Sequence, residues 1–194
     1  MYRAEQKYYG VFFENLKKIQ DLGLAKHHPT RIINSIYYDT NDLQFFKLSE
    51  EGSTPRQKIR IRWYSNFNNI KIENKSKEFD FSKKFFFDIG VFDIKKINFY
   101  IMKFTNQKIF PKLKVSYSRK YFIDRSSQTR YTLDYNINYF KVDNKYRSVE
   151  RCKSKFSIIE VKKNINNREI QSTSILGNKR ARHSKYCEGI KEFY

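Results

Sequence analysis

Hydrophobic and polar residues alternate most strictly between residues 57 and 65 of the chain. Successive side chains of a β-strand point to opposite faces, so this pattern predicts a strand with an apolar row on one side. The other side carries consecutive cations, which repel one another on a sheet. A row of this kind indicates that the strand binds something anionic. The cations are Lys58, Arg60 and Arg62, and the apolar row is Ile59, Ile61 and Trp63.

Alternation also predicts several further strands. Several of them, such as residues 3–9 and 69–78, have polar residues at alternating positions and would present one polar face. The longest covers residues 112–123, where lysine and serine alternate with apolar and aromatic residues. The expected strands cover residues 3–9, 31–39, 69–78, 112–123, 129–136 and 156–163.

Fewer segments have helical spacing. Apolar residues near a 3.6-residue period predict a helix over residues 11–24, and residues 96–106 also favour a helix. A turn and a short helical piece are expected after residue 39, with Asp39 or Thr40 as the cap. Shorter helices are expected within residues 165–176 and 182–193.

Many strands with few helices favour a closed antiparallel β-barrel with peripheral helices, an α+β fold in which β-structure dominates. The 194 residues suffice for one domain with a sizeable core, and no linker or repeat divides them, so we expect a single domain over residues 1–194. If the polar strand faces turn inward, the barrel encloses charge, and unpaired buried charge is costly. Such an interior needs an anionic, solvated or metal-bound occupant.

Composition narrows the range of partners. The chain has 40 Lys and Arg against 20 Asp and Glu, a formal net charge of +20, which favours nucleic acid, polyphosphate, nucleotides or an anionic membrane surface. General solubility explains scattered lysines equally well, but it does not explain the ordered row at Arg60 and Arg62. With 18 Phe and 15 Tyr, the chain is too aromatic for a disordered basic tail.

Cysteine usage and hydropathy favour a reducing, aqueous compartment. Cys152 and Cys187 are too few for a disulfide framework and lack the spacing of a zinc site. The sequence has no apolar run of membrane-spanning length and no signal-peptide pattern. We therefore expect a cytoplasmic protein, for which any membrane contact would come from a partner.

Short motifs occur in order along nearly the whole chain. They are Arg3-x-Glu5-x-Lys7-Tyr8, Ser35-Ile-Tyr-Tyr-Asp39-Thr40, Lys58-Ile-Arg60-Ile-Arg62-Trp63-Tyr64, Ile72-Glu73-Asn-Lys75, Val115-Ser-Tyr117-Ser-Arg119, Arg130-Tyr-Thr-Leu-Asp134, Ile159-Glu160-Val-Lys162 and Ser184-Lys185-Tyr186-Cys187. Together they resemble the VTC domain, the polyphosphate polymerase domain of the vacuolar transporter chaperone family. That family belongs to the CYTH or triphosphate tunnel metalloenzyme superfamily.

The resemblance implies both a fold and a site. The fold would be an antiparallel barrel whose basic interior binds a triphosphate, with a divalent metal, Mn²⁺ or Mg²⁺, held by Glu160. Arg60 and Arg62 would be the paired phosphate-binding arginines. The other catalytic positions would be Lys7, Lys75, Arg119 and Lys185. Further substrate-binding positions would be Tyr117, Arg130, Ser184 and Lys58, together with Lys83 or Lys84, between which the spacing does not choose.

The activity that the resemblance implies is polyphosphate synthesis. The γ-phosphate of a nucleoside triphosphate would pass to phosphate, pyrophosphate or a polyphosphate chain. Hydrolytic members of the superfamily carry Glu-x-Glu-x-Lys on the first strand, whereas here Arg3 takes the first position and only Glu5 remains, which favours the polymerase branch. Triphosphate hydrolysis stays an alternative. So does a non-catalytic module that binds polyphosphate or nucleic acid, although arginines inside a barrel argue against nucleic acid.

Several of these residues also have simpler interpretations. Glu160 and Lys162 could form an exposed pair on a strand, a common arrangement of strand charges. Tyr117 could be a core residue whose hydroxyl reaches the rim. Glu73 is expected to be an ion-pair partner that positions one of the strand arginines, rather than a second acidic member of the metal site.

Overall fold

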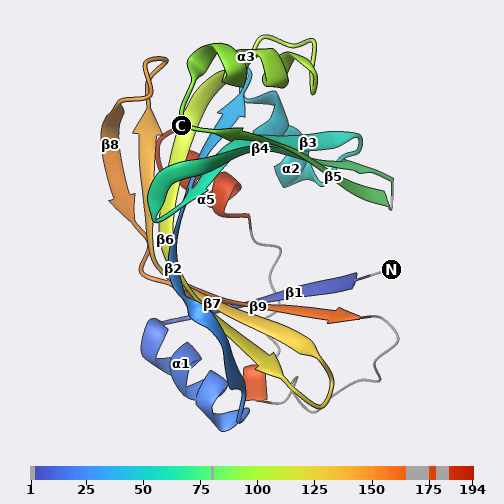
Figure 1. Cartoon of the computed structure of the whole chain (residues 1–194), viewed down its shortest axis with the longest axis vertical. Coiled ribbons are helices and arrows are strands. Elements are labelled where there is room, and N and C mark those ends of the chain that lie inside the picture. The colour runs from blue at the N-terminus through green and yellow to red at the C-terminus, as the bar shows by residue number, and fades with distance from the viewer. Residues whose placement is uncertain (1–2, 80, 165–174, 178–183) are drawn as a thin grey trace. The chain divides into compact units, whose positions relative to one another are not determined.

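The computed structural model in Figure 1 describes residues 3–79, 81–164, 175–177 and 184–194. None of the helices in these ranges is long and apolar enough to span a membrane. The strands are β1 (Arg3–Gly10), β2 (Ala25–Asp39), β3 (Arg56–Tyr64), β4 (Asn66–Glu78), β5 (Phe81–Gly90), β6 (Phe110–Asp124), β7 (Thr129–Val142), β8 (Ser148–Lys153) and β9 (Ser157–Asn164). The helices with defined bounds are α1 (Phe12–Asp21), α2 (Gln44–Glu51), α3 (Ile94–Met102) and α5 (Lys185–Lys191).

The strands form one mainly antiparallel sheet, which confirms the expected α+β class dominated by β-structure. The strand order is β1-β9-β7-β6-β2-β3-β4-β5, and β8 pairs with β7. β1 and β5 end this order, and within the described residues they do not pair with each other. The expected closed barrel is therefore wrong for this structure. Residue alternation specifies which face of a strand is buried, but it does not specify whether two edge strands meet.

Contacts within the chain divide it into two compact units, which we describe separately. Strands β2, β6 and β7 are long enough to contribute residues to both. The first unit comprises Met1–Ile32, Tyr117–Ile137 and Lys153–His183, and the second comprises Ile33–Ser116, Asn138–Cys152 and Ser184–Tyr194.

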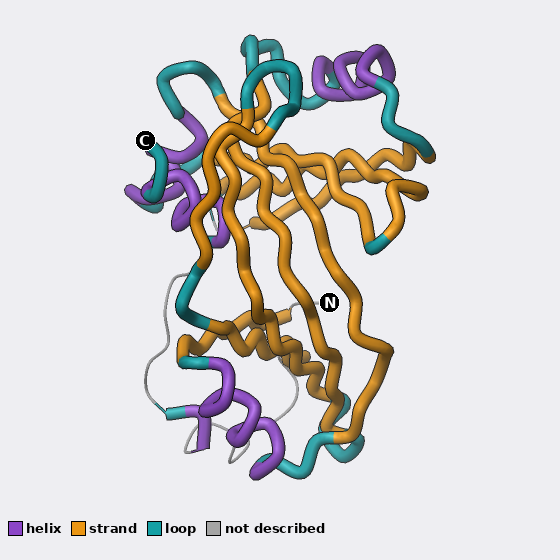
Figure 2. Tube along the Cα trace, turned by 90° about the vertical axis from the view of Figure 1, so that its left-hand side faces the viewer, coloured by secondary structure: helices purple, strands orange, loops and turns teal. Residues whose placement is uncertain are grey.

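In the first unit, α1 packs against β1 and β9, and Figure 2 shows this helix beside those strands. The apolar face of α1 buries Ile19 in a cluster with Tyr8 of β1 and Val161 of β9. Because strand side chains alternate between faces, the positions next to Tyr8 and Val161 point away from this core. That second face carries the polar residues of the unit's strands.

In the second unit, the apolar row of β3 forms the centre of the core. Ile59 and Ile61 are fully buried and cluster with Ile72 of β4 and Ile97 of α3. The observed burial of β3 alternates strictly along residues 58–63. The cationic row therefore lies on the face opposite this core, as the sequence predicts.

The helical piece expected after residue 39 is α2, and both candidate caps contribute to it. The Asp39 carboxylate accepts hydrogen bonds from the backbone N–H groups of Phe45 and Phe46, at 2.9 Å each. The Thr40 hydroxyl accepts another from the N–H of Gln44, at 2.9 Å. These groups satisfy amides in the first turn that have no partner within the helix.

Other element boundaries differ more from the sequence pattern. The helices expected over 11–24 and 96–106 are present as the shorter α1 and α3. β7 continues to Val142 and β8 follows it, neither of which alternation predicts. The helix expected within 165–176 falls mostly outside the described residues, whereas the tail helix is α5.

Candidate functional site

Strand pairing places the polar residues of β3 and β4 on one face. Lys58 pairs with Lys75 across the two strands, and Arg60 pairs with Glu73. Residues directly opposite each other in an antiparallel pair point to the same side, and Arg62 joins them because it lies two residues after Arg60. The structure thus places the predicted cations of β3 and β4 on the same sheet face as Glu73.

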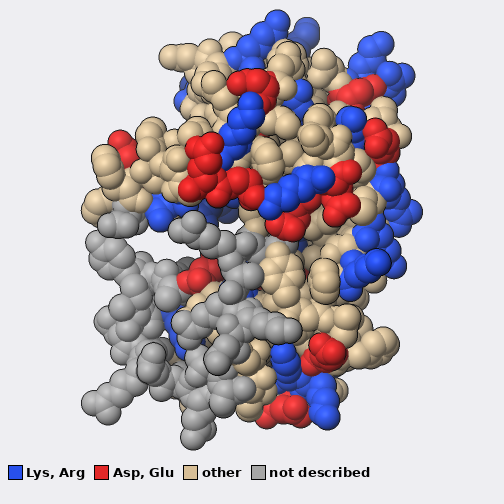
Figure 3. Space-filling model, turned by 180° about the vertical axis from the view of Figure 1, so that it is seen from behind, with Lys and Arg blue, Asp and Glu red and all other residues tan. Residues whose placement is uncertain are grey.

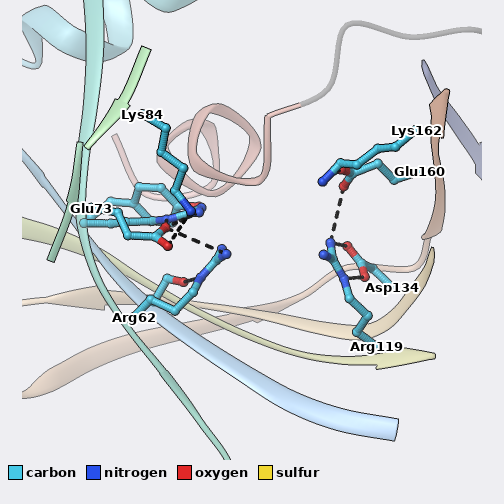
Figure 4. Close-up of polar contacts among 10 residues, drawn as sticks. Arg62, Glu73, Lys84, Arg119, Asp134, Glu160 and Lys162 are labelled. Atoms are coloured by element: carbon cyan, nitrogen blue, oxygen red, sulfur yellow. Dashed lines mark hydrogen bonds and ion pairs between the residues drawn. The ribbon is translucent and has the colours of Figure 1, made fainter. Parts of the chain in front are cut away.

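Glu73 is the buried centre of this cation cluster (Figure 4). Its carboxylate accepts from Arg60 Nε at 2.7 Å and from Lys84 Nζ at 2.7 Å, while Arg62 NH1 lies 3.9 Å away. Burial alone would raise the pKa of Glu73, but the charges of Arg60, Arg62 and Lys84 outweigh burial and hold the pKa at about 2. Glu73 is therefore an ionised ion-pair partner of the strand arginines, the role expected for it.

Two side chains of β2 orient the guanidinium groups. Arg60 NH1 donates to the Tyr37 hydroxyl at 2.9 Å, and Arg62 Nε donates to the Ser35 hydroxyl at 3.1 Å. Burial would raise the pKa of Tyr37, but the charges of Arg60 and Arg62, with the hydrogen bond from Arg60, bring it below its ordinary value. The Tyr37 hydroxyl thus lies in a strongly positive field.

The register of β4 and β5 separates Lys83 from Lys84. Lys84 pairs with Lys75, so it shares the face of Glu73 and reaches its carboxylate. Lys83 pairs with Ser76 on the opposite face. There it lines a separate pocket of about 400 Å³ whose walls include Leu48 of α2. Of the two candidates, only Lys84 belongs to the cation cluster.

The N-terminus of α5 lies against the same strand face. Ser184 is the N-cap of α5, and its hydroxyl accepts from Lys58 Nζ at 2.9 Å and from the N–H of Cys187 at 3.4 Å. Burial would raise the pKa of Tyr37, whereas Arg60, Arg62 and, to a smaller extent, the charge of Lys185 lower it. Lys185 therefore acts electrostatically on the same tyrosine as the two arginines. Ser184 therefore contacts the cation row of the second unit directly, and Lys185 follows it as the first residue of α5.

The first unit contains its own charged cluster, centred on Arg119 (Figure 4). Arg119 donates to Asp134 through two nitrogens, Nε at 2.5 Å and NH2 at 2.7 Å, and NH2 lies 3.3 Å from Glu160. Glu160 also pairs with Lys162 at 2.8 Å. Burial would lower the pKa of Arg119, but Asp134 and the other anionic neighbours raise it, so the guanidinium stays charged. The buried ring of Tyr117 lies 5.5 Å from this guanidinium.

Lys7 and Glu160 are directly opposite each other on β1 and β9. Glu5 is opposite Lys162 in the same register, and Lys7 Nζ lies 2.8 Å from Glu5. β7 lies along the edge of β9 opposite to β1, and there Arg130 pairs with Lys162. The side chain of Arg130 is exposed. The structure thus brings the predicted residues of the first unit onto one sheet face. Glu160 is buried rather than exposed, so it is not part of a solvated surface pair.

The carboxylates on this face fit a hard divalent cation. Glu5 and Glu160 are diagonal neighbours, because Glu5 pairs with the residue two positions after Glu160. Among the described residues, no group of three or more His, Cys, Asp or Glu forms a complete metal site. Mg²⁺ and similar cations commonly use one or two protein carboxylates and take their other ligands from phosphate and water. A cation held at Glu5 and Glu160 would therefore take its remaining ligands from groups other than these two carboxylates.

Sequence reasoning assigned no role to three residues that orient the predicted site. They are Ser35 and Tyr37, which contact the arginines, and Asp134, which holds Arg119. All three lie inside the sequence motifs, and Ser35 and Tyr37 occupy alternating positions of one strand. A polar residue on the same strand face as a predicted ligand is the signal that could have identified them.

Comparisons with known proteins agree with the sequence motifs. The family model of the VTC domain matches residues 5–194. None of the curated proteins matches the sequence. Among solved structures, the PH1819 protein of Pyrococcus horikoshii OT3 is similar, with 17% identity, a TM-score of 0.57, and coverage of 98% of this chain and 99% of that chain. A candidate adenylate cyclase of Vibrio parahaemolyticus is also similar, with 12% identity, a TM-score of 0.57, and 98% of both chains covered.

These two structural likenesses show a shared fold. The family match is more specific, because it spans both compact units and every one of the motifs from Glu5 onwards. The ordered motifs, the cation clusters on the strand faces and the match over residues 5–194 lead to one conclusion: this chain belongs to the VTC domain family.

Proposed function

We propose that this chain is a metal-dependent polyphosphate polymerase, which transfers the γ-phosphate of a nucleoside triphosphate to a phosphate or polyphosphate acceptor. The observation that carries the proposal is the cation cluster around Glu73. There Arg60, Arg62 and Lys84 surround a single buried carboxylate on the β3–β5 face. Such an excess of oriented cations fits a polyanionic substrate.

Phosphoryl transfer depends mainly on positioning and on stabilising negative charge. Arg60 and Arg62 supply planar guanidinium groups that match phosphate oxygens, and each is held by a defined partner on β2. Lys58, Lys75 and Lys84 act as point charges on the same face. We assign these residues to binding the phosphates of the donor and stabilising the charge that shifts between them.

The N-terminus of α5 supplies the groups for the terminal phosphate. Ser184 already accepts a hydrogen bond from Lys58, so its hydroxyl lies within the reach of the cation row. Lys185 follows it and shares the electrostatic environment of Tyr37. We assign Ser184 and Lys185 to orienting the γ-phosphate for in-line attack.

Glu160 and Glu5 are the residues that we assign to the divalent cation, Mn²⁺ or Mg²⁺. When bound, such a cation neutralises phosphate charge and polarises the phosphorus. Arg119 contacts Glu160 and is itself fixed by Asp134, so it holds the carboxylate in place. Lys7, opposite Glu160 in the sheet, adds a cation beside this carboxylate. Arg130 and Tyr117 complete the polar face of the first unit.

Polymerase activity is favoured over hydrolysis by the first strand. Arg3 stands where hydrolytic members of the superfamily carry a glutamate, so one metal-side carboxylate is missing. Membership in the VTC domain family favours the same activity. The acceptor in this proposal is a phosphate group rather than water.

The direct test incubates purified protein with ATP and Mn²⁺ and follows polyphosphate on a gel. The wild type should produce chains, and Arg60→Ala should reduce the rate on the order of a hundredfold, as loss of a charge-stabilising donor typically does. Lys95→Ala, at an exposed position of α3, is the matched control and should retain the wild-type rate.

Two outcomes would contradict the proposal in different ways. Release of orthophosphate without chains would identify a triphosphatase. Tripolyphosphate binding without turnover, unaffected by Glu160→Gln, would identify a non-catalytic polyanion-binding module.

A further inference from the structure

A continuous series of contacts links Arg60 to helix α5 within the second unit. Arg60 NH1 donates to the Tyr37 hydroxyl at 2.9 Å. The ring of Tyr37 stacks on the ring of Tyr186, with centroids 5.1 Å apart and an interplanar angle of 24°. Tyr186 follows Ser184 and Lys185 directly in the chain. The stacked pair therefore connects a phosphate-binding arginine to the helix that carries the γ-phosphate residues.

The hydroxyl group of Tyr186 is bound to Asp39. The Tyr186 hydroxyl donates to Asp39 Oδ2, and both residues are almost completely inaccessible to solvent. Asp39 also accepts from the N–H groups of Thr40, Phe45 and Phe46, at 2.7, 2.9 and 2.9 Å. Burial and the nearby Asp39 carboxylate raise the pKa of Tyr186 far above its ordinary range, so the phenol remains a donor.

Helix α5 depends on such contacts for its position. It contains seven residues, which is too short for a helix to be stable through its own hydrogen bonds. On its inner side, a Cβ on Gly189 would lie 2.5 Å from Leu113 and 2.6 Å from Tyr139, so the helix packs closely on the sheet. Packing at Gly189 fixes the distance between helix α5 and the sheet. The contacts of Tyr186 fix the N-terminal end of the helix, next to Ser184.

We propose that Tyr186 and Asp39 are positioning residues, which hold Ser184 and Lys185 over the Lys58–Arg60 end of the cation row. The contact between the Tyr186 hydroxyl and Asp39, together with the stack on Tyr37, sets where the N-terminus of α5 lies. This inference rests on the proposed function, because it assigns Ser184 and Lys185 to phosphate. It adds two residues that need not touch substrate, since both are buried.

Tyr186→Phe is the informative variant, because it keeps the stacked ring and removes only the hydroxyl. We expect tripolyphosphate, the probe ligand, to bind about tenfold more weakly in isothermal titration, the cost of one charge-assisted hydrogen bond. Tyr38→Phe is the matched control. Its hydroxyl bonds to Tyr146 at 2.9 Å on the opposite face of β2, so this variant should lose stability without losing affinity.

A double-mutant cycle separates positioning from general destabilisation. In a Ser184→Ala, Lys185→Ala background, Tyr186→Phe should cause no further loss of tripolyphosphate affinity, because the residues that it positions are gone. An equal loss in both backgrounds would overturn the inference. Asp39→Asn, which keeps the side-chain volume, should weaken binding in the same non-additive way.

Hydrogen–deuterium exchange of residues 185–191 tests the anchoring without any substrate. Exchange should be faster in Tyr186→Phe than in the wild type, while Tyr38→Phe leaves it unchanged. Unchanged exchange in Tyr186→Phe would overturn the inference even if polymerase activity is found. If the wild type binds no tripolyphosphate, the proposed function fails, and the role of Tyr186 in positioning phosphate-binding residues fails with it.

Discussion

At the scale of single residues, Glu73 determines how the cation cluster is organised. Arg60 of β3 and Lys84 of β5 meet at this one carboxylate, and Figure 4 shows Lys84 reaching it. Without it, several cations would face one another across β3, β4 and β5 with no anion between them. Glu73 therefore offsets the repulsion among these cations and keeps the guanidinium of Arg60 in a fixed orientation.

This role of Glu73 predicts a pH-dependent contribution to stability. Its pKa of about 2 lies below the value of about 4.3 for an unfolded chain. A depressed pKa contributes stability that is present above the unfolded value and is lost as the pH falls towards the folded value. Glu73→Gln should therefore lower the free energy of unfolding by about 3 kcal/mol at neutral pH.

Urea unfolding of the wild type and of Glu73→Gln at a series of pH values measures this contribution. The difference between the two proteins should shrink between about pH 4 and pH 2, where Glu73 becomes protonated. A difference that stays constant over this range would show that the carboxylate charge is not what stabilises the cluster.

The neighbours Lys83 and Lys84 provide a matched pair for phosphate binding. Lys84→Gln should weaken tripolyphosphate binding several-fold, because it removes a cation from the face of Glu73. Lys83→Gln should leave the affinity unchanged, because register places Lys83 on the opposite face. Titration calorimetry on both variants checks the assignment, and equal losses would contradict the observed register.

Sequence alone predicts part of this site for a clear physical reason. The alternation through Lys58, Arg60 and Arg62 fixes their common face, since strand side chains alternate within one strand. The choice between Lys83 and Lys84 depends instead on the turn before β5, where a shift of one residue exchanges the two faces. No pattern within β5 could decide it.

At the scale of elements, caps and clamps position the strands that carry the site. Asn15 of α1 is fully buried, and its amide donates to the carbonyl of Ser157 at 3.2 Å and to the Ser157 hydroxyl at 2.9 Å. The same amide lies 3.4 Å from the carbonyl of Gly10. This one side chain thus ties the helix to the end of β1 and the start of β9.

Removing this clamp should destabilise the first unit. Asn15→Ala leaves buried carbonyl and hydroxyl groups without their donor, so we expect a loss of roughly 2 kcal/mol in the free energy of unfolding. Asn98→Ala, at an exposed position of α3, is the control and should change stability by less than about 0.5 kcal/mol. Denaturant unfolding compares the two, and a negligible effect of Asn15→Ala would contradict the clamp.

Element type is more predictable from the sequence than element extent. The period of apolar residues identifies α1, because one face of that helix must cover β1 and β9. The capping of α2 by Asp39 and Thr40 is predictable from their residue types, but the first residue of the helix is not, since the Asp39 carboxylate caps the first turn from several residues upstream. β8 lacks a buried face, with most of its residues exposed, so alternation gives no signal there.

At the scale of the whole molecule, positive charge is widespread. Figure 3 shows Lys and Arg side chains distributed over one face, together with groups of Asp and Glu. A formal net charge of +20 attracts any polyanion, so binding alone does not demonstrate a specific site. The organised clusters at Glu73 and Arg119 are what distinguish this chain from a generally basic protein.

At this scale the sequence predicts the type of sheet but not whether the sheet closes. The sequence predicts a mainly antiparallel sheet, and the strand order confirms it. Closure of that sheet, which both the strand-rich pattern and the family resemblance favour, is not found, since β1 and β5 do not pair in the described part of the chain. Whether two edge strands meet depends on how the whole sheet curves, and no local pattern encodes that curvature.

In the proposed reaction, a phosphate chain rather than water accepts the γ-phosphate. A phosphorus NMR time course with ATP and Mn²⁺, on aliquots quenched with EDTA, tests it most directly. The proposal predicts that signals of internal polyphosphate groups grow in step with ADP, and that both grow about a hundredfold more slowly with Arg60→Ala but at the wild-type rate with Lys95→Ala. Growth of orthophosphate alone in step with ADP, or the same spectra from Arg60→Ala, would contradict it.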